Sequence, residues 1–324
     1  MTIKQQVLEA LINKKGESVS GEQLAKELFC SRNAVWKAIK SLKDDGYKID
    51  AVTNKGYCLK EESSLFSATS LESVLNNKCK VILLESIDST NNYLKKLAEK
   101  GAQENTVVIA NTQTGGKGRM GRSFYSQNGL YLSILLKPKF PAEKSLFITT
   151  AAAVAVAEAI ESVSGKKAKI KWVNDVFIDD KKVCGILTEA AMDLESGGLN
   201  YAVLGIGINI YNPDGFPKEI ENIAGTVFET EPESDVKLKL TQYVINNFFD
   251  IYNNIENSDF MKKYKEKSLI IGKKINVLKD GKSIKAKAID IDENAKLLVE
   301  YPDKTLEKLY SGEVSINLRG VKNE

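Results

Sequence analysis

Residues 105–138 read NTVVIANTQTGGKGRMGRSFYSQNGLYLSILLKP, in which two apolar, β-branched runs flank a glycine-rich segment. Gly116, Gly118 and Gly121 match the dinucleotide fingerprint G-x-G-x-x-G, and the same segment is one residue away from the P-loop pattern. Both motifs need a helix after the glycines, whereas residues 126–138 are typical of a second strand. The fingerprint also needs an acidic residue about 20 positions further on, and this stretch contains none. The pattern therefore predicts a glycine loop between two strands.

The predicted loop carries three basic side chains, those of Lys117, Arg119 and Arg122, and no acidic one. Glycine lets backbone amides approach a ligand closely, and arginine binds phosphate oxygens in bidentate geometry. We expect the loop to hold a polyphosphate or an acyl phosphate. A nucleic-acid backbone is the alternative ligand, because Arg/Gly segments also bind it.

The composition narrows the chemistry. With 324 residues the chain is long enough for two or three domains, and its net charge is only +3. It contains no histidine, which excludes Ser-His-Asp and Cys-His nucleophile systems and any metal site that needs imidazole. The four cysteines lack C-x-x-C spacing, so neither a zinc ribbon nor a disulfide framework is expected. We therefore predict no protein-held metal, and chemistry based on lysine, arginine, carboxylates, amides and bound Mg²⁺.

No targeting or membrane segment is apparent. The N-terminal residues form an amphipathic pattern without the apolar core of a secretory signal. The most apolar run, which begins at Ser145, is shorter than the roughly 20 residues that span a bilayer, and it includes Glu158. We expect a cytoplasmic protein with no membrane partner.

The N-terminal region, residues 1–62, shows the pattern of a winged helix-turn-helix. Apolar residues at helical spacing predict helices over residues 3–13, 20–28 and 31–46, with a short turn between the second and third. Two alternating strands over residues 47–59 then predict a hairpin with a basic tip, as in a wing.

The third predicted helix is basic on its outer side. A recognition helix contacts bases through its first residues, so Arg32 and Asn33 are the candidates for base reading. The alternative is that this face is merely solvated. Six residues of the helix and the wing are the candidate DNA contacts: Arg32, Asn33, Trp36, Lys37, Lys40 and Lys55.

A polar, serine-rich linker over residues 63–80 leads into a central domain, residues 81–267, and then a C-terminal domain, residues 268–324. Strand patterns separated by hairpin turns predict a central mixed, mostly antiparallel sheet with helices on one side. Short strands separated by turns after residue 268 predict a small SH3-like β-barrel.

Several polar residues within the central domain can each be interpreted in two ways, as structural residues or as functional ones. Ser89 to Asn91 open a helix, where they are either N-caps or converging donors and acceptors for a polar ligand. Asp175 follows Asn174, a pair typical of a turn but also suited to a general base or a Mg²⁺ ligand. Lys182 is expected at a hairpin turn, either solvated or partly desolvated where the chain enters an apolar strand.

Four segments, in this order and behind a winged helix, together resemble one family. They are STNNYL (89–94), QTGGKGRMGRSFYS (113–126), KWVNDVFIDDKKVCGIL (171–187) and GIGINI (205–210). The chain resembles the bifunctional biotin-protein ligases that also repress the biotin operon, and the resemblance covers essentially its whole length. It implies a class II synthetase-like ligase domain, and an ATP-dependent ligase that forms biotinyl-5′-AMP from biotin and MgATP. That adenylate would then acylate a lysine of the biotin carboxyl carrier protein of acetyl-CoA carboxylase or a similar enzyme.

The resemblance also implies roles for individual residues. Biotin would be bound by Ser89, Thr90, Asn91, Gln113, Lys117, Gly118, Arg119 and Lys182. ATP and the adenylate would be bound by Lys117, Arg119, Arg122, Asn174 and Asn209. The catalytic residues would be Lys182, Arg119 and Asp175, with Asp175 handling the proton of the acceptor lysine. The implied partners are operator DNA and a second copy of the chain, paired through the central sheet.

Two positions depart from the family pattern. Lys117 stands where the family loop usually has arginine, which keeps the charge but loses the fork geometry. Asn317 stands where an arginine is expected to contact ATP, and Arg319 lies two residues further on.

Two other functions compete with this one. A lipoate ligase shares the catalytic architecture but carries an R-R-x-x-G-G-G-A-V-x-H motif, which this chain lacks along with any histidine. A repressor that only senses biotin needs no chemistry on an acceptor lysine, and Lys182 and Asp175 therefore argue against it.

Overall fold

The computed structural model describes residues 2–14, 16–44, 47–52, 55–60, 66–192, 198–233, 235–257, 259–279, 282–310 and 313–315. By its contacts the chain divides into two compact units. One comprises Met1–Leu83 with Pro232–Gln242, and the other comprises Leu84–Glu231 with Tyr243–Glu324. The boundaries placed after residues 62, 80 and 267 from the sequence stay predictions.

The first unit contains the predicted helix-turn-helix. Its helices are α1 (Ile3–Asn13), α2 (Gly21–Glu27), α3 (Arg32–Asp44) and α4 (Ala68–Val74). Side-chain oxygens of Thr2 and Ser20 accept hydrogen bonds from the first turns of α1 and α2, as N-caps do. Val35, Ile39 and Leu42 of α3 pack with buried residues of α1 and α2 in one apolar core. This core holds α3 so that its opposite face is exposed.

The wing is a hairpin of β1 (Ile49–Val52) and β2 (Gly56–Leu59), paired antiparallel. Its predicted tip residues Thr53 and Asn54 lie outside the described residues. Close to the turn of the hairpin, where it pairs with Ala51 of β1, Tyr57 exchanges backbone hydrogen bonds of 2.8 Å with Val19, which ties the wing to the segment before α2. Gly56 has φ +100°, and a Cβ added there would lie 2.1 Å from the carbonyl oxygen of Val19. Only glycine fits this position.

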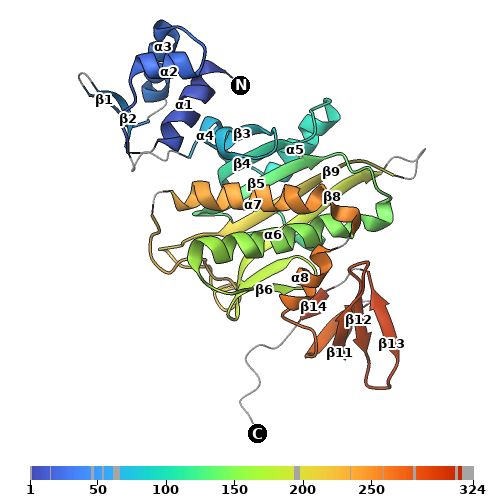
Figure 1. Cartoon of the computed structure of the whole chain (residues 1–324). Coiled ribbons are helices and arrows are strands. Elements are labelled where there is room, and N and C mark those ends of the chain that lie inside the picture. Colours follow the sequence, from blue (N-terminus) through green and yellow to red (C-terminus); the bar gives the residue numbers. More distant parts are fainter. Residues whose placement is uncertain are drawn as a thin grey trace. The chain divides into compact units, whose positions relative to one another are not determined.

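The second unit is built on a sheet with the strand order β3-β4-β5-β9-β8-β7-β6, and every ladder from β4 to β6 is antiparallel (Figure 1). The strands are β3 (Lys80–Ile87), β4 (Thr106–Gln113), β5 (Gly129–Leu136), β6 (Ala168–Lys171), β7 (Asp175–Ile178), β8 (Lys181–Met192) and β9 (Leu199–Asn209). The glycine segment connects β4 to β5, as predicted, and no helix of a dinucleotide or P-loop site follows it.

The sheet is covered on both faces, which corrects the expectation of helices on one side. The helices are α5 (Thr90–Glu99), α6 (Leu146–Ser164), α7 (Val236–Tyr252) and α8 (Phe260–Glu266), with short 3-10 turns at Arg119–Gly121, Ala142–Lys144 and Ile255–Asn257. On β8, Thr188 is hydrogen-bonded to Thr149 of α6, and the next residue, Glu189, to Asn91 of α5. Adjacent residues of a strand point to opposite faces, so α5 and α6 lie on opposite faces. The residue pattern of β5 does not reveal this, because its residues are buried on both faces of the sheet.

Helix α6 is the apolar segment noted in the sequence. The stretch Ala142–Ser164 is long and apolar enough to cross a membrane, but most of it is buried inside the unit. The alanines of α6 are fully buried, and small side chains allow neighbouring elements to approach the helix closely. α6 is therefore a core helix.

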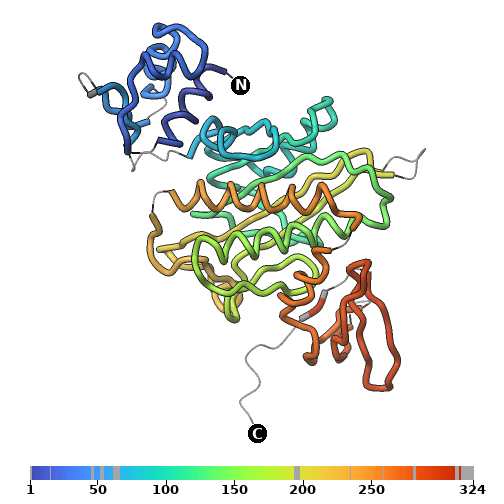
Figure 2. Tube along the Cα trace, viewed as in Figure 1, coloured from blue at the N-terminus to red at the C-terminus, as the bar shows by residue number. Residues whose placement is uncertain are grey.

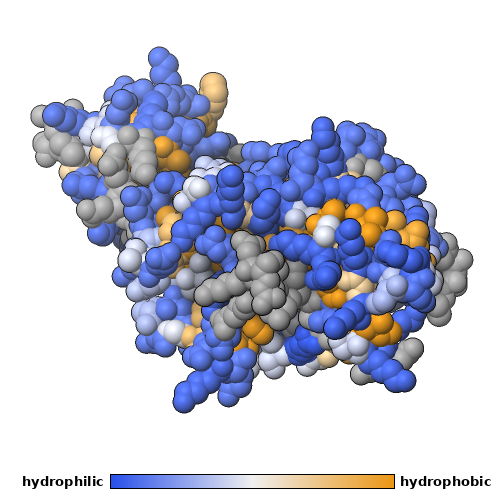
Figure 3. Space-filling view, turned by 90° about the horizontal axis from the view of Figure 1, so that it is seen from below, coloured by the Kyte–Doolittle hydropathy of each residue, from blue (hydrophilic) through white to orange (hydrophobic). Residues whose placement is uncertain are grey.

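The surface seen in Figure 3 is mostly hydrophilic, with apolar residues in separate small patches.

Glu161 joins three elements. Its Oε1 accepts a hydrogen bond from the amide of Ala168 at 3.0 Å, and its Oε2 lies 2.6 Å from Nζ of Lys267. Burial opposes ionisation of this carboxyl, but the bonds from Lys267 and Ala168 outweigh it and hold its pKa below the ordinary value of 4.5. Glu161 thus links the end of α6 to β6 and to the residue after α8.

We expect Glu161→Gln to lower the free energy of unfolding by about 1 kcal/mol at pH 7, because a charge-assisted bond is lost from a partly screened site. Since the folded pKa is depressed, the stabilisation is complete above the unfolded pKa and is lost as the pH falls through the folded pKa. Urea unfolding of both proteins at pH 7 and at pH values below 4.5 measures this difference. An equal difference at both pH values would contradict the assignment.

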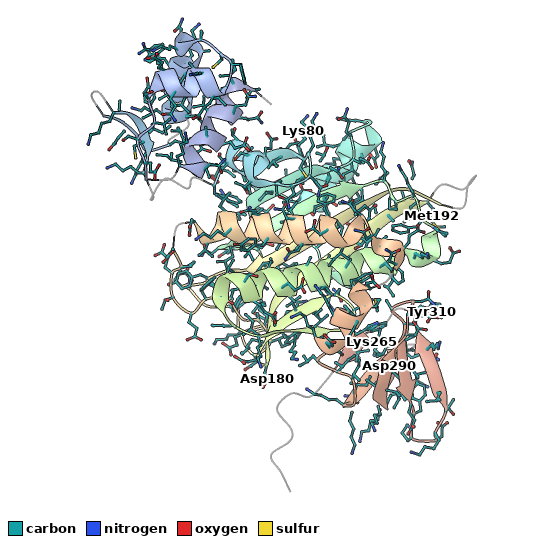
Figure 4. All side chains as sticks on the ribbon, viewed as in Figure 1. Lys80, Asp180, Met192, Lys265, Asp290 and Tyr310 are labelled. Carbon is teal, nitrogen blue, oxygen red and sulfur yellow. The ribbon has the colours of Figure 1, made fainter. Side chains whose placement is uncertain are left out.

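The C-terminal domain is an antiparallel sheet of five strands in the order β13-β12-β11-β10-β14, in agreement with the predicted small β domain. The strands are β10 (Lys274–Lys279), β11 (Lys282–Ile291), β12 (Leu297–Glu300), β13 (Leu306–Leu309) and β14 (Glu313–Ser315). Lys265 of α8 and Asp290 of β11 form an ion pair of 3.0 Å (Figure 4).

The C-terminal domain is also tied to the turn after β6. Nε1 of Trp172 donates to the carbonyl oxygen of Ala295 at 2.9 Å, and the hydroxyl of Tyr264 donates to the carbonyl of Val173 at 3.0 Å. Ile170 exchanges backbone hydrogen bonds with Lys267 and Leu269, which brings the yellow-green β6 beside the end of the orange α8 (Figure 2). These contacts fix the segment that continues into Asn174 and Asp175.

Candidate functional site

The glycine loop is anchored at its base and closed on itself. The amides of Thr114 and Gly115 donate to the carbonyls of Ile87 and Asp88 at 2.9 and 2.8 Å. Further on, the amide of Gly118 donates to the carbonyl of Arg122 at 2.7 Å. A Cβ at Gly116 would meet the carbonyl of Phe124 and the hydroxyl of Ser126 at 2.5 Å, so this glycine permits the closure.

The loop forms one side of a cavity of about 140 Å³. The lining contains five basic side chains and one acidic one, Asp175. The basic side chains come from three separate segments: Lys117, Arg119, Arg122, Lys171 and Lys182. Val314 of the C-terminal domain also contributes to the wall. This excess of positive charge suits a ligand with several negative charges.

Lys182 lies within β8 and not in the preceding turn. That turn consists of Asp179 and Asp180, and the exposed Asp180 is labelled in Figure 4. Its side chain is 27% exposed, and its Nζ lies 2.7 Å from Oδ1 of Asp175. The amide of Lys182 donates to the carbonyl of Ile223 at 2.7 Å, which fixes the strand at this residue. This geometry agrees with the interpretation in which the Lys182 ammonium is partly desolvated, and not with a fully solvated side chain.

Asn174 connects the loop to the sheet. Its Nδ2 donates to the carbonyl of Ile186 at 2.9 Å, and its Oδ1 accepts a hydrogen bond of 3.1 Å from Nη1 of Arg119. The amide of Ile186 in turn donates to the backbone carbonyl of Asn174 at 3.0 Å. Asn174 is buried, so it holds Arg119 at a defined place in the cavity wall.

A second, smaller cavity of about 30 Å³ lies next to the first. Its polar lining contains Ser89, Thr90, Asn91 and Gln113, together with Lys117. Oε1 of Gln113 accepts hydrogen bonds from the amide and the hydroxyl of Thr90 at 2.8 and 3.0 Å. The Ser89 hydroxyl caps α5 through the amide of Asn92 at 3.5 Å, so Ser89 both caps the helix and lines the cavity.

Phe124 borders both cavities. Lys117, Gly185 and Leu187 are the other residues that the two linings share. A Cβ at Gly185 or Gly207 would lie 2.9 or 2.6 Å from the Phe124 ring, so the ring lies directly against the backbone of β8 and β9. The two cavities are therefore parts of one site with an aromatic ring between them.

One described candidate from the sequence, Asn209, is not found in these linings. Nδ2 of Asn209, at the end of β9, donates to the carbonyl of Gly225 at 3.0 Å, and the residue lines neither cavity. Asn317 and Arg319 lie outside the described residues. Gly118 does line the larger cavity.

Some residues of the site were not among the sequence-based candidates. Ser133, a serine within the fully buried strand β5, lies 2.8 Å from Oγ1 of Thr90 and 2.6 Å from Oδ1 of Asn91. A lone hydroxyl in an apolar strand is a usable signal, because a buried polar group needs a partner. Lys171 and Trp172 gave no such signal.

Burial raises the pKa of the Cys184 thiol, which lies on β8 beside the larger cavity, and of the Tyr131 hydroxyl on β5. Both groups therefore stay protonated near neutral pH and supply neither a nucleophile nor a base. Among the described residues no group of three or more Cys, Asp or Glu side chains is arranged to hold a metal ion.

In the first unit, the outer face of α3 is basic and exposed. Trp36 is 52% exposed, and Nζ of Lys40 lies 5.7 Å from the centre of its ring. The other candidate DNA contacts are exposed as well: Arg32, Asn33, Lys37 and Lys55. The structure thus places five of the six on one helix and the sixth, Lys55, in the wing.

Three family descriptions match successive parts of the chain. Residues 4–58 match an HTH domain, residues 83–209 the biotin/lipoate A/B protein ligase family, and residues 270–316 the biotin protein ligase C terminal domain. Among solved structures, the biotin protein ligase from Aquifex aeolicus in complex with biotin and ATP is 30% identical, with a TM-score of 0.59. That alignment covers 72% of this chain and 97% of the other.

Relatives of full length are found among bacterial regulators. The bifunctional ligase/repressor BirA of Bacillus subtilis is 32% identical, over 97% of this chain and 99% of its own length. The protein of the same name from Escherichia coli is 28% identical, over 93% and 94% of the two chains. With this identity over nearly its whole length and its matches to the three family descriptions, the chain belongs to the family of BirA-type bifunctional ligase/repressors.

Proposed function

We propose that the enzyme joins biotin to the AMP moiety of ATP, with release of pyrophosphate. It then transfers the biotinyl group to one lysine of a biotin carboxyl carrier protein, with release of AMP. The observation that carries this proposal is the larger cavity, whose lining contains five basic side chains and one carboxylate. Attack of the biotin carboxylate on the α-phosphate brings several negative charges together, and pre-arranged cations stabilise them. A carboxylate nucleophile is already ionised, so this step needs no histidine.

The smaller cavity is the proposed site of the biotin ring. Ser89, Thr90, Asn91 and Gln113 offer donors and acceptors suited to a cyclic urea. The cavity has room for little more than a water molecule while Phe124 lies against Gly207, so the Phe124 ring has to move when a bicyclic ligand enters.

Lys182 and Asp175 are the proposed pair for the two steps. Lys182 would exchange its contact with Asp175 for the biotin carboxylate, and later for the oxygens of the acyl phosphate. Asp175, released by this exchange, would orient the acceptor lysine or take its proton. Arg119, held by Asn174, would contact the biotin carboxylate and the phosphates, and Arg122 and Lys117 would contact the phosphates. Asn209 would act on the adenylate only after a rearrangement at the end of β9.

Mg²⁺ is the metal proposed to accompany ATP. The described residues fit it poorly as protein ligands, because the lining has a single carboxylate, and Lys182 is paired with it. Mg²⁺ in nucleotide sites is held largely by phosphates and water, with only one or two carboxylates. We therefore assign it no protein cage and no step.

For the repressor activity we propose that α3 enters the major groove of operator DNA, with Arg32 and Asn33 at the base edges and Lys55 of the wing at the backbone. Symmetric operators are read by dimers, so we propose a homodimer formed through the central sheet in the adenylate-bound state. Four free cysteines and the use of ATP suit a cytoplasmic location.

The enzymatic proposal is tested with purified protein, biotin, MgATP and a carrier domain, followed by mass spectrometry of the carrier. We expect one biotin mass on one lysine, and no addition when lipoate replaces biotin. A carrier that is modified by a reference ligase but not by this protein would exclude the proposal and favour a sensor. Addition of lipoate would favour the lipoate-ligase reading.

A further inference from the structure

Glu189 lies directly behind the smaller cavity without lining it. Its Oε2 accepts a hydrogen bond of 2.8 Å from Nδ2 of Asn91, which does line the cavity. Its Oε1 accepts one of 2.7 Å from Nζ of Lys95, one turn further along α5. Both contacts join α5 to β8, and neither belongs to the roles assigned above.

The carboxylate determines which way the Asn91 amide faces. An ionised carboxylate can only accept hydrogen bonds, so it requires the NH₂ group of Asn91 on its side. The second N–H of that group points to the carbonyl of Leu187, at 3.4 Å. In the reversed orientation, the amide oxygen would lie against the negatively charged carboxylate of Glu189.

The amide oxygen is therefore on the side of Ser133. The Ser133 hydroxyl lies 2.6 Å from Oδ1 of Asn91 and 2.8 Å from Oγ1 of Thr90. Its single proton has to serve both oxygens, because the Thr90 hydroxyl donates to Gln113. Oδ1 of Asn91 thus keeps an unused acceptor site at the cavity.

The position of Asn91 is tight as well as oriented. A Cβ at Gly205 of β9 would lie 2.2 Å from Oδ1 of Asn91, so the amide packs against the bare strand backbone. Burial opposes ionisation of Glu189, but the hydrogen bonds from Lys95 and Asn91 outweigh it and lower the pKa of this carboxyl. The acceptor that orients Asn91 is therefore charged at neutral pH.

We propose that Glu189, held by Lys95, is a positioning residue that fixes Asn91 as an acceptor for a ureido N–H of biotin. This inference rests on the proposed function, because it concerns recognition in the same cavity. Glu189, which does not contact biotin in this proposal, thus determines that Asn91 presents an acceptor and not a donor to the ligand.

The test is the Glu189→Gln variant, with biotin binding measured by titration calorimetry. Glutamine can donate as well as accept, so the Asn91 amide is no longer held in one orientation. We expect biotin to bind about 10- to 100-fold more weakly, the range for leaving one buried hydrogen-bonding group of the complex without its partner. The KM for biotin in the ligation assay should rise by the same factor, while kcat at saturating biotin stays within about twofold of the wild type.

Two further proteins separate positioning from simple tethering of α5. In an Asn91→Ala background, Glu189→Gln should change biotin affinity by less than about twofold, because the residue through which it acts is gone. Glu161→Gln, a matched loss of a half-buried Glu–Lys pair, should lower stability without changing biotin affinity.

The inference is overturned if Glu189→Gln binds biotin like the wild type, or if it weakens binding equally with and without Asn91. Should Glu189→Gln fail to fold, Lys95→Gln takes its place: with the cation gone, biotin affinity should fall more steeply as the pH is lowered toward 5. An unchanged pH profile contradicts the inference. Binding is measured without ATP or carrier, so a wild-type protein that binds biotin but does not ligate would count against the proposed function alone.

Discussion

Lys182→Ala is expected to lower the rate of biotin transfer to the carrier by about 100- to 1000-fold, the usual loss when one charge-stabilising donor is removed from an active site. The Lys182 ammonium is the basic group nearest the carboxylate of the larger cavity, and it lies 6.0 Å from the centre of the Phe124 ring, between the two cavities. Its loss also leaves Asp175 unneutralised beside incoming phosphate groups. Single-turnover formation of biotinyl-5′-AMP and transfer to the carrier, measured separately, show which step is slowed.

Lys181→Ala provides the matched control. This neighbouring lysine donates from Nζ to the carbonyl of Glu221 at 2.6 Å and lines neither cavity. We expect its variant to keep nearly full activity, and Lys182→Arg to recover only part of it, because a guanidinium fork differs from a compact ammonium. Equal losses in the Lys181 and Lys182 variants would argue that β8 is disturbed and that the Lys182 ammonium has no special role.

Gly56→Ala is expected to abolish specific operator binding while biotin transfer continues. A Cβ at this position would lie 2.1 Å from the carbonyl oxygen of Val19 and 2.6 Å from the Cα of Ser20, both backbone atoms, at a φ of +100°. Overpacking and the strained φ together cost on the order of 3 kcal/mol, a large share of the stability of a small domain. Gel-shift titration and the carrier assay on the same preparation measure the two activities.

Gly101→Ala, in the second unit, is a control for alanine at a positive φ without overpacking, since Gly101 has φ +83° but open space where a Cβ would go. It should affect operator binding very little.

Arg32→Ala tests base recognition. If Arg32 reads bases, its loss should weaken binding to the operator more than binding to random DNA. Equal weakening of both would reduce Arg32 to a phosphate contact.

The parts of the fold that the sequence predicts well depend on local pattern. The glycine loop follows from the two β-rich runs around it, and the helix-turn-helix follows from apolar spacing and its caps. The hydroxyls and amides of Ser89, Thr90 and Asn91 were recognisable because they open a helix after a strand. These features need only neighbouring residues to specify them.

The parts that the sequence does not predict depend on contacts between distant segments. Lys182 is assigned to a turn by its charged neighbours, yet pairing of its backbone with the segment of Ile223 keeps it in β8. The placement of α5 and α6 on opposite faces depends on which side of a doubly buried strand each helix covers. Asn209 belongs to a recognisable motif, but its bond to Gly225 leaves it outside both cavity linings.

The hydrogen bond from Trp172 to Ala295 spans 123 positions of sequence and joins the wall of the larger cavity to the C-terminal domain. Modules of a family are often exchanged by recombination at domain boundaries. Recombination after Lys267 would separate Trp172 from its hydrogen-bond partner Ala295. The segment that continues to Asp175 would then lose its support from the C-terminal domain. Ligase and C-terminal domains are therefore expected to be inherited together. No described residue of the winged domain lines either cavity, so we expect that domain to be gained, lost or replaced more readily.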